Sequence, residues 1–312
     1  KGNVINPDDI VKEYGADILR LWVLSSDFKS DISVSRDILK QISEAYRKIR
    51  NTARYILGNT SDFDPDNKVE YKDMEEIDKW ALSRLNKLVK DCTENYENFN
   101  FHLVYHDINQ FCVTDMSNFY LDIIKDRLYT SKKNAIERRS AQTAMYIILD
   151  ALVKMVAPMI CFTAEEIWKY MPHTKNEQVE SVMLSDWPEV VAEYDNKELE
   201  EKWNHILELK ELVAKELEVA RAQKVIGHSL NAKVTLFANE DEYKFLEENK
   251  ELLTTIFIVS ALEIKENERK DENKIGVKVE VAEGERCWKY STEVGENPDH
   301  PTLCHRCAEA IS

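Results

Sequence analysis

The sequence predicts a mainly α protein: a helix bundle, then a small α/β domain, then a C-terminal cysteine knuckle. Apolar residues recur at helical spacing through most of the first two thirds of the chain, and the period becomes that of strands after about residue 224. Three cysteines gather in the last 26 residues. Only 7 glycines and 7 prolines interrupt the 312 residues, which favours long helices over a turn-rich all-β architecture.

The composition is that of a globular protein with two or three domains, because 43% of its residues are hydrophobic. Six cysteines without a signal peptide favour the reducing cytoplasm. No membrane span is expected, since the longest apolar run, 145–161, is broken by Asp150, Lys154 and Pro158. No exposed apolar helix face is evident, so we expect a monomer.

The net charge of −16 would argue against a polyanionic partner if the charge were uniform, because a uniformly acidic surface repels phosphate. The charge is unevenly distributed, however. Acidic residues concentrate at 189–218 and 240–251, whereas residues 40–54 and 125–139 are locally basic. If the protein binds nucleic acid, these basic segments and the tail carry the contacts.

Residues 1–34 form the first predicted segment. Asn6 is a good N-cap and Pro7 a good first helical residue, Gly15 ends this short helix, and a second helix follows from Ala16. The abrupt start without a methionine predicts that the chain is a fragment of a longer protein.

A helix bundle is predicted for residues 35–190. Its first helix carries an apolar stripe and is expected to stop at Gly58. Arg47, Arg50 and Arg54 share another face, where they would grip a nucleic-acid backbone; a solvated helix face is the competing interpretation. The stripe consists of Ile38, Ile42, Ala45, Ile49, Ala53 and Ile56.

Three further helices are predicted at 78–98, 101–129 and 134–156, and their aromatic residues at helical period are expected to be core. Thr163 and Glu166 form a predicted capping box for a last helix that Pro172 closes. Residues 174–194 show no regular element, and Trp187 is expected to anchor this connector on the bundle.

Residues 191–282 are predicted to be a small α/β domain. One long acidic helix covers 197–224. Strands are predicted at 234–237, 255–259 and 275–281, with a helix at 241–252 between the first two.

The tail, residues 283–312, is predicted to be a zinc-finger-like knuckle. Cys304 and Cys307 form a CxxC, and Cys287 supplies a third thiol. The expected fourth thiol is missing at Gly284. Either His305 or His300 completes a zinc site, or packing alone holds the knuckle.

Several of these segments resemble the bacterial isoleucyl-tRNA synthetases, a family of class I enzymes, and the resemblance covers essentially the whole chain. Residues 1–7 and 14–22 are similar to the sequence that follows the family's KMSKS signature, and residues 47–59 to the start of its anticodon-binding domain. Residues 158–168 are a broader class I feature. Residues 217–230 and the cysteine tail resemble the family's C-terminal junction and zinc-binding peptide.

The resemblance implies a protein that attaches isoleucine to tRNA(Ile) with ATP and Mg²⁺, of which this fragment is the tRNA-recognition half. The HIGH and KMSKS elements would precede residue 1, so the fragment alone is expected to be inactive. No DNA or membrane partner is expected. The residues expected to meet tRNA are Arg47, Arg50 and Arg54 in the helical anticodon-binding domain, with Lys132, Lys133, Arg138 and Arg139, and Arg286, Trp288, Lys289 and Arg306 in the tail.

Three alternatives remain open at this stage. Valyl and leucyl relatives share the architecture. A helical scaffold without catalytic function would use the acidic helix 197–224 to dock on a basic partner. For Trp288, packing on the knuckle competes with stacking on a base.

Overall fold

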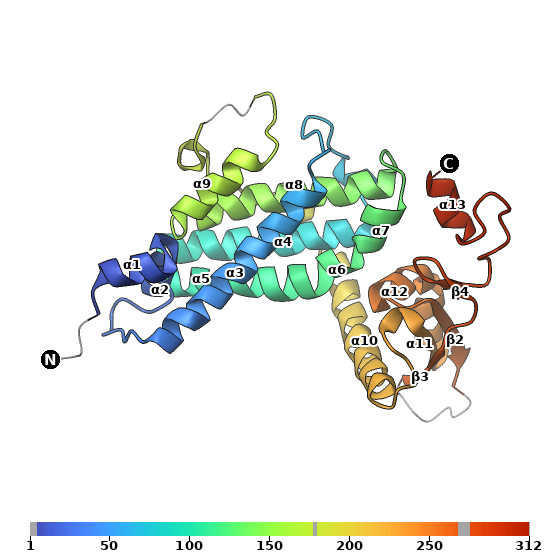
Figure 1. Ribbon diagram of the computed structural model, residues 1–312. Coiled ribbons are helices and arrows are strands. Elements are labelled where there is room, and N and C mark those ends of the chain that lie inside the picture. The colour runs from blue at the N-terminus through green and yellow to red at the C-terminus, as the bar shows by residue number, and fades with distance from the viewer. Residues whose placement is uncertain (1–4, 177–179, 268–274, 312) are drawn as a thin grey trace. The chain divides into compact units, whose positions relative to one another are not determined.

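The computed structural model describes residues 5–176, 180–267 and 275–311 (Figure 1). Its internal contacts divide the chain into two compact units: residues 1–128 with 133–196, and residues 129–132 with 197–312. The first unit is helical and the second contains the sheet. A mainly α fold with a small α/β part and a C-terminal cysteine cluster is thus confirmed.

The helices of the first unit lie side by side, with α3, α4, α5 and α8 forming the bundle (Figure 1). The elements, with short 3₁₀ turns marked η, are α1 (Pro7–Tyr14), α2 (Ala16–Leu24), α3 (Arg36–Asn59), η1 (Tyr71–Asp73), α4 (Glu76–Glu97), α5 (Phe101–Gln110), a π-helix η2 (Phe111–Tyr120), α6 (Leu121–Ile123), α7 (Lys125–Thr130), α8 (Ile136–Val156), α9 (Cys161–Tyr170), η3 (Val182–Leu184) and η4 (Ala192–Tyr194).

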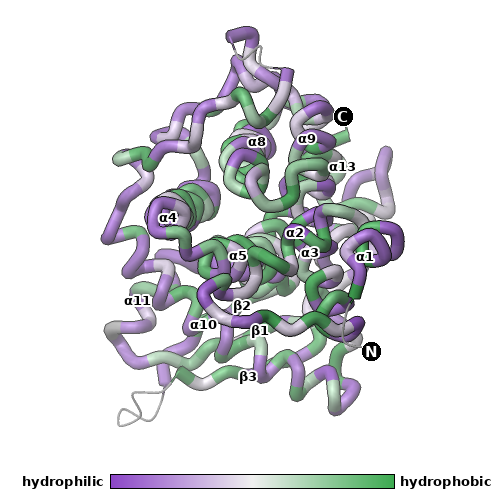
Figure 2. Tube along the Cα trace, turned by 90° about the vertical axis from the view of Figure 1, so that its left-hand side faces the viewer, coloured by the Kyte–Doolittle hydropathy of each residue, from purple (hydrophilic) through white to green (hydrophobic). Residues whose placement is uncertain are grey.

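Helix α8 forms the centre of the bundle. It is buried around most of its circumference, and its buried polar side chains have partners. The Gln142 amide donates to the Asn59 carbonyl and to Asp62, while the Thr143 hydroxyl accepts from the N–H of Val69. These bonds offset the desolvation cost of polar groups in the core. Figure 2 shows hydrophobic residues recurring between hydrophilic ones along α5 and α8.

The apolar stripe of α3 is buried as predicted, apart from the half-buried Ile38. Its expected stop at Gly58 is wrong, because the helix runs to Asn59. Gly58 keeps a negative φ, and the Thr60 hydroxyl and N–H bond the carbonyls of Ile56 and Leu57. Threonine, which the sequence pattern does not mark as a stop, therefore closes this helix.

The single helix predicted at 101–129 is divided into four elements, α5, η2, α6 and α7. The wide turns of the π-helix lie against Thr52 of α3, whose hydroxyl is 3.4 Å from the Cys112 carbonyl and 3.2 Å from the Ser117 hydroxyl. A side chain that bonds into a helix in this way accompanies such local widening.

The predicted capping box of α9 does not form. The helix starts at Cys161, so Thr163 lies inside its first turn. The N–H groups of Phe162 and Thr163 donate instead to Asp17 of α2. Two other expectations are confirmed: α9 closes before Pro172, with Met171 as its C-cap, and Trp187 anchors its connector through a 2.8 Å bond from its indole N–H to Thr93.

The second unit contains a three-stranded sheet in the order β2-β1-β3. Strand β1 pairs with β2 in parallel and with β3 antiparallel; Leu236 lies opposite Ile264 and Val277. The elements are α10 (Lys197–Ala222), η5 (Ser229–Asn231), β1 (Ala232–Ala238), α11 (Glu240–Glu248), α12 (Lys250–Phe257), β2 (Ala261–Glu266), β3 (Gly276–Val281), β4 (Glu285–Arg286), β5 (Tyr290–Ser291) and α13 (His305–Ile311).

The strand predicted at 255–259 is wrong, and so is the single helix at 241–252. Two helices, α11 and α12, occupy this stretch, and the strand follows at Ala261. The hydroxyls of Thr254 and Thr255 bond the carbonyls four residues earlier, which satisfies them inside a helix despite their β-branched side chains. Ile258, with φ of 55°, then ends α12. Among the described residues, no helix has the length and apolar character needed to cross a membrane.

Candidate nucleic-acid interface and thiol cluster

Arg47, Arg50 and Arg54 form an exposed ladder on α3. Ser35 caps this helix by accepting from the N–H of Ile38, and the buried stripe fixes its rotation, so the arginines point away from the bundle. None of the three forms an ion pair with another described residue. Unpaired guanidinium groups in this arrangement remain available for phosphate oxygens.

Lys40 extends this ladder by one cation toward the start of α3. Lys40 is exposed and lies seven residues before Arg47, which places both on the same face of the helix. The spacing of seven residues between Lys40 and Arg47 is the sequence signal that places Lys40 on this face. From Lys40 to Arg54 the basic face extends about 21 Å along the helix axis.

The basic segment 125–139 behaves differently, because its arginines are used inside the protein. Arg127 binds the fully buried Asp78 at 2.7 Å, and Arg138 binds Asp62 at 3.0 Å. Arg139 donates to the Asn67 carbonyl and covers the ring of Phe63. The sequence-based assignment of Arg138 and Arg139 to phosphate contacts is therefore not supported by their positions.

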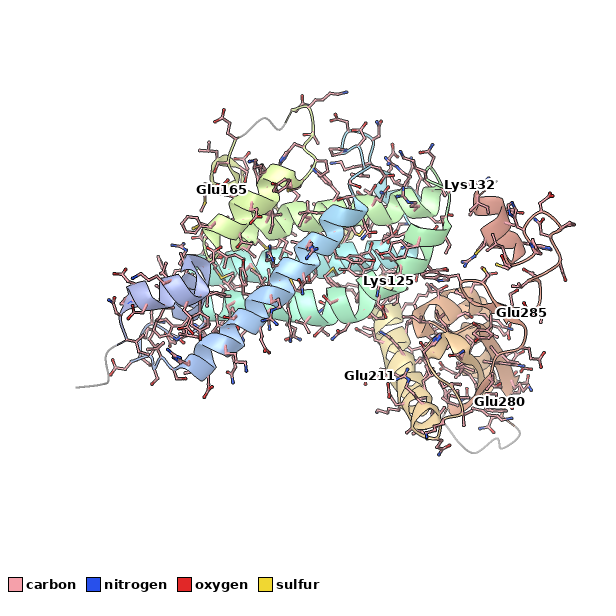
Figure 3. The ribbon with its side chains drawn as sticks, in the orientation of Figure 1. Lys125, Lys132, Glu165, Glu211, Glu280 and Glu285 are labelled. Atoms are coloured by element: carbon pink, nitrogen blue, oxygen red, sulfur yellow. The ribbon has the colours of Figure 1, made fainter. Side chains whose placement is uncertain are left out.

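Lys132 and Lys133 remain exposed in the loop after α7. Figure 3 labels Lys132. Exposed acidic residues, among them Glu211 of α10 and Glu280 of β3, mark the surface of the second unit (Figure 3). Acidic side chains of this kind repel phosphate, whereas the exposed cations of α3 and of this loop attract it.

The three cysteines of the tail come together. The Sγ of Cys287 is 3.5 Å from that of Cys304 and 3.1 Å from that of Cys307, and all three lie within 4.8 Å of one another. Cys287 occupies the turn between β4 and β5, Cys304 precedes α13, and Cys307 lies in its first turn. Three sulfurs at this separation suit a single zinc ion, since Zn–S bonds of about 2.3 Å place tetrahedral sulfurs about 3.8 Å apart.

The thiols of this cluster differ in their ionisation. Burial opposes ionisation of Cys287, but hydrogen bonds from the Cys304 backbone and from the Cys307 and Cys304 thiols lower its pKa. Burial, together with its bonds to the other two thiols, raises the pKa of Cys307 to about 12. Cys287 therefore ionises more readily than Cys307.

Neither histidine proposed as a fourth ligand joins the thiols. The Nε2 of His305 is 3.2 Å from a carboxylate oxygen of Glu296, and the described metal-ligand cluster contains neither His305 nor His300. The sequence-based suggestion that one of them completes the site is not supported by this arrangement.

Hydrogen bonds tie the knuckle to the edge of the sheet. The Tyr290 hydroxyl accepts from Asn231 at 2.8 Å, and the Tyr290 N–H donates to the hydroxyl of Ser260. That hydroxyl donates in turn to the carbonyl of Leu230. The turn that carries Cys287 is thus held to the α/β fold without a metal.

The remaining predicted contact residues surround the thiols. Trp288 and Lys289 lie half-buried in the turn after Cys287, and Arg306 is exposed on the first turn of α13. Arg286 belongs to β4, but its side chain lies outside the described residues. An indole beside cationic groups is a suitable platform for an unstacked base.

Comparison with known proteins agrees with this arrangement. Residues 78–236 match the family of the anticodon-binding domain of tRNA ligase, residues 1–35 match class I tRNA synthetases (I, L, M and V), and residues 285–310 match the zinc finger found in FPG and IleRS. The first match covers half of the chain, so this chain belongs to the anticodon-binding domain family of tRNA ligases.

Curated relatives that match over nearly the whole chain are isoleucine–tRNA ligases. The isoleucine–tRNA ligases of Caldicellulosiruptor saccharolyticus and Caldicellulosiruptor bescii are 52% and 51% identical over the whole chain, which covers 34% of each. That of Caldanaerobacter subterraneus subsp. tengcongensis is 48% identical over 99% of the chain and 34% of its own length. The resemblance to isoleucyl enzymes is thus confirmed, and the chain spans about a third of the relatives it matches.

Proposed function

We propose that this chain is the tRNA-recognition part of an isoleucine–tRNA ligase. The observation that carries the proposal is the exposed, unpaired ladder of Arg47, Arg50 and Arg54 on a protein of net charge −16. Three adjacent exposed cations without carboxylate partners form a locally positive surface, which attracts phosphates even though the protein as a whole is acidic.

In this proposal the ladder binds the phosphates of tRNA(Ile). Lys40 and Lys132 are also exposed, and in this proposal they bind phosphates as well. Phosphate contacts position the RNA without reading its sequence, and each contact made through counterion release steepens the salt dependence of binding.

The tail is proposed to meet the anticodon. Anticodon bases are unstacked and accessible, and Trp288 offers an aromatic face while Lys289, Arg306 and Arg286 neutralise nearby phosphates. Zn²⁺ held by Cys287, Cys304 and Cys307 would order this turn and take no part in chemistry.

The chain spans about a third of the isoleucine–tRNA ligases that it matches. We propose that isoleucine and ATP, with Mg²⁺, are bound by the remaining two thirds of the relatives' length, and that this chain alone does not aminoacylate tRNA. We further propose a cytoplasmic monomer that binds neither DNA nor membranes.

The test is binding of the purified chain to tRNA(Ile) and to a copy with an altered anticodon, over a salt series. We expect tighter binding of the normal anticodon and a steep loss of affinity with salt. Arg50→Ala should weaken binding of both RNAs equally and lower the salt slope by about 1. Lys48→Ala is the matched control, because Lys48 is exposed on the same helix but lies about 100° away from Arg47.

Two results would contradict the proposal. Equal, weak binding of both RNAs would remove the tail as an anticodon reader. No binding at low salt would favour the alternative of a helical scaffold, in which the acidic α10 docks on a basic protein.

A further inference from the structure

The thiol cluster supplies three ligands to a metal ion that takes four. The donor set of Cys287, Cys304 and Cys307 suits Zn²⁺ in chemistry and in spacing. Structural zinc sites are almost always closed by a fourth protein ligand, whereas a site with three protein ligands leaves one position for a molecule from solution. The origin of the fourth ligand therefore decides what kind of site this is.

Position 284 cannot supply it. Gly284 has φ of 92°, a conformation that side chains rarely adopt. A Cβ placed on it would lie 2.3 Å from the Ser291 carbonyl oxygen and 2.6 Å from the Thr292 nitrogen, and both are backbone atoms of the paired segment. Gly284, which directly precedes β4, is thus required by its close approach to the end of β5, and a cysteine cannot replace it without moving the hairpin.

Other side chains nearby are oriented elsewhere. His305 lies inside the CxxC, but its Nε2 bonds Glu296 at 3.2 Å, and its side chain is about half exposed. Within residues 5–176, 180–267 and 275–311, no fourth histidine, cysteine, aspartate or glutamate joins the three sulfurs. Cys287 is only half-buried, so the cluster lies close to solvent on the side of this residue.

We propose that the tail is a three-thiolate metal site whose fourth ligand is a small donor from solution, such as a low-molecular-weight thiol or an imidazole, and not a residue of this chain. A thiol that coordinated the metal would lose its proton to solvent and would take the position that the three cysteines leave open; no oxidant or reductant would take part. This inference concerns the metal site alone and stands whether or not the chain binds tRNA.

The test uses Co²⁺ as a spectroscopic substitute for Zn²⁺ in the full chain, kept reduced with a phosphine. We expect one Co²⁺ per chain with sulfur-to-metal absorption, and a saturable change of the visible spectrum when 2-mercaptoethanol or imidazole is added. His305→Ala, His300→Ala and Glu296→Ala should each bind Co²⁺ as the wild type does and show the same change.

Gly284→Cys and Gly284→Ala form a matched pair, because both add the same Cβ and only one adds a thiol. We expect both to lower the melting temperature equally and neither to bind Co²⁺ more tightly. Cys287→Ser should weaken Co²⁺ binding more than about tenfold, since even the outer-shell partners of metal ligands are worth 10–100-fold.

Three outcomes would overturn the inference. They are a wild-type spectrum that does not respond to added donors, loss of the tetrahedral spectrum in His305→Ala, and failure of the chain to bind Co²⁺ at all. None of them depends on RNA, so failure here is distinguishable from failure of the tRNA proposal.

Discussion

The carboxylate of Asp17 caps a helix that begins 144 residues later in the chain. It accepts from the Thr163 N–H at 2.8 Å and from the Thr163 hydroxyl at 2.6 Å, and Asp17 is buried. Asp17→Ala should lower the free energy of unfolding by about 2–3 kcal/mol, because it removes the cap and leaves buried donors unsatisfied. Urea denaturation followed by circular dichroism measures this.

Asp9→Ala is the control for that substitution, since Asp9 is exposed in the first turn of α1. Its effect should stay within about 0.5 kcal/mol. Equal effects of the two substitutions would show that Asp17 does not act as the cap of α9.

A second prediction concerns the buried pair of Asp78 and Arg127. Asp78 also accepts from Tyr120 at 2.7 Å and Ser140 at 2.5 Å, so four elements meet at one carboxylate. Asp78→Leu should cost about 3–5 kcal/mol, because it leaves the Arg127 charge buried and unpaired. In the double variant Asp78→Leu/Arg127→Met most of this loss should be recovered, and a double variant as unstable as the single one would contradict this account.

The third prediction is a pH dependence of stability that involves Asp62. Although burial opposes it, hydrogen bonds from Arg138 and Gln142 hold the pKa of Asp62 below its ordinary value. A carboxyl whose pKa is lower in the folded state stabilises the fold above its unfolded pKa, and this contribution is lost as the pH falls through the folded pKa. Wild type should therefore be more stable than Asp62→Asn at pH 7, and the gap between their urea midpoints should close below about pH 4.

A gap that stays constant from pH 7 to pH 3 would show that the hydrogen-bonding geometry of Asp62, and not its charge, stabilises the fold. Arg138→Met in place of Asp62→Asn tests the same pair from the other side. It should lose stability at pH 7 and show less acid sensitivity than wild type.

Local patterns predicted much of the fold. The apolar stripe and Ser35 identify α3, and the change of period identifies the sheet. The predictions that were wrong concern features that depend on distant partners or on local hydrogen bonds, which composition does not reveal. The cap of α9 comes from Asp17 in α2, and the back-bonding hydroxyls of Thr254 and Thr255 turn a β-branched run into a helix.

In the candidate site, too, local spacing predicted some features, whereas others depend on residues that are distant in the sequence. The spacing of the cysteines predicted that the three thiols lie together, and the i, i+3, i+7 spacing predicted that the arginines share one exposed face. The internal use of Arg138 and Arg139 depends on Asp62 and Asn67, which are 76 and 72 residues away. The requirement for glycine at 284 depends on a positive φ that no sequence pattern displays.

The last prediction decides between base stacking and packing for Trp288. Trp288 is half-buried in the turn that follows Cys287; its ring makes an edge-on contact with that of Tyr129, at 6.1 Å between the ring centroids, and its exposed part is open to a base. If it stacks on an anticodon base, Trp288→Ala should weaken binding of tRNA(Ile) by about 1–3 kcal/mol, while Trp288→Phe retains most of the affinity. The melting temperature and the metal content of the tail should be unchanged in both variants. If Trp288 only packs on the knuckle, Trp288→Ala should instead lower the melting temperature or the Co²⁺ affinity and affect RNAs with normal and altered anticodons alike.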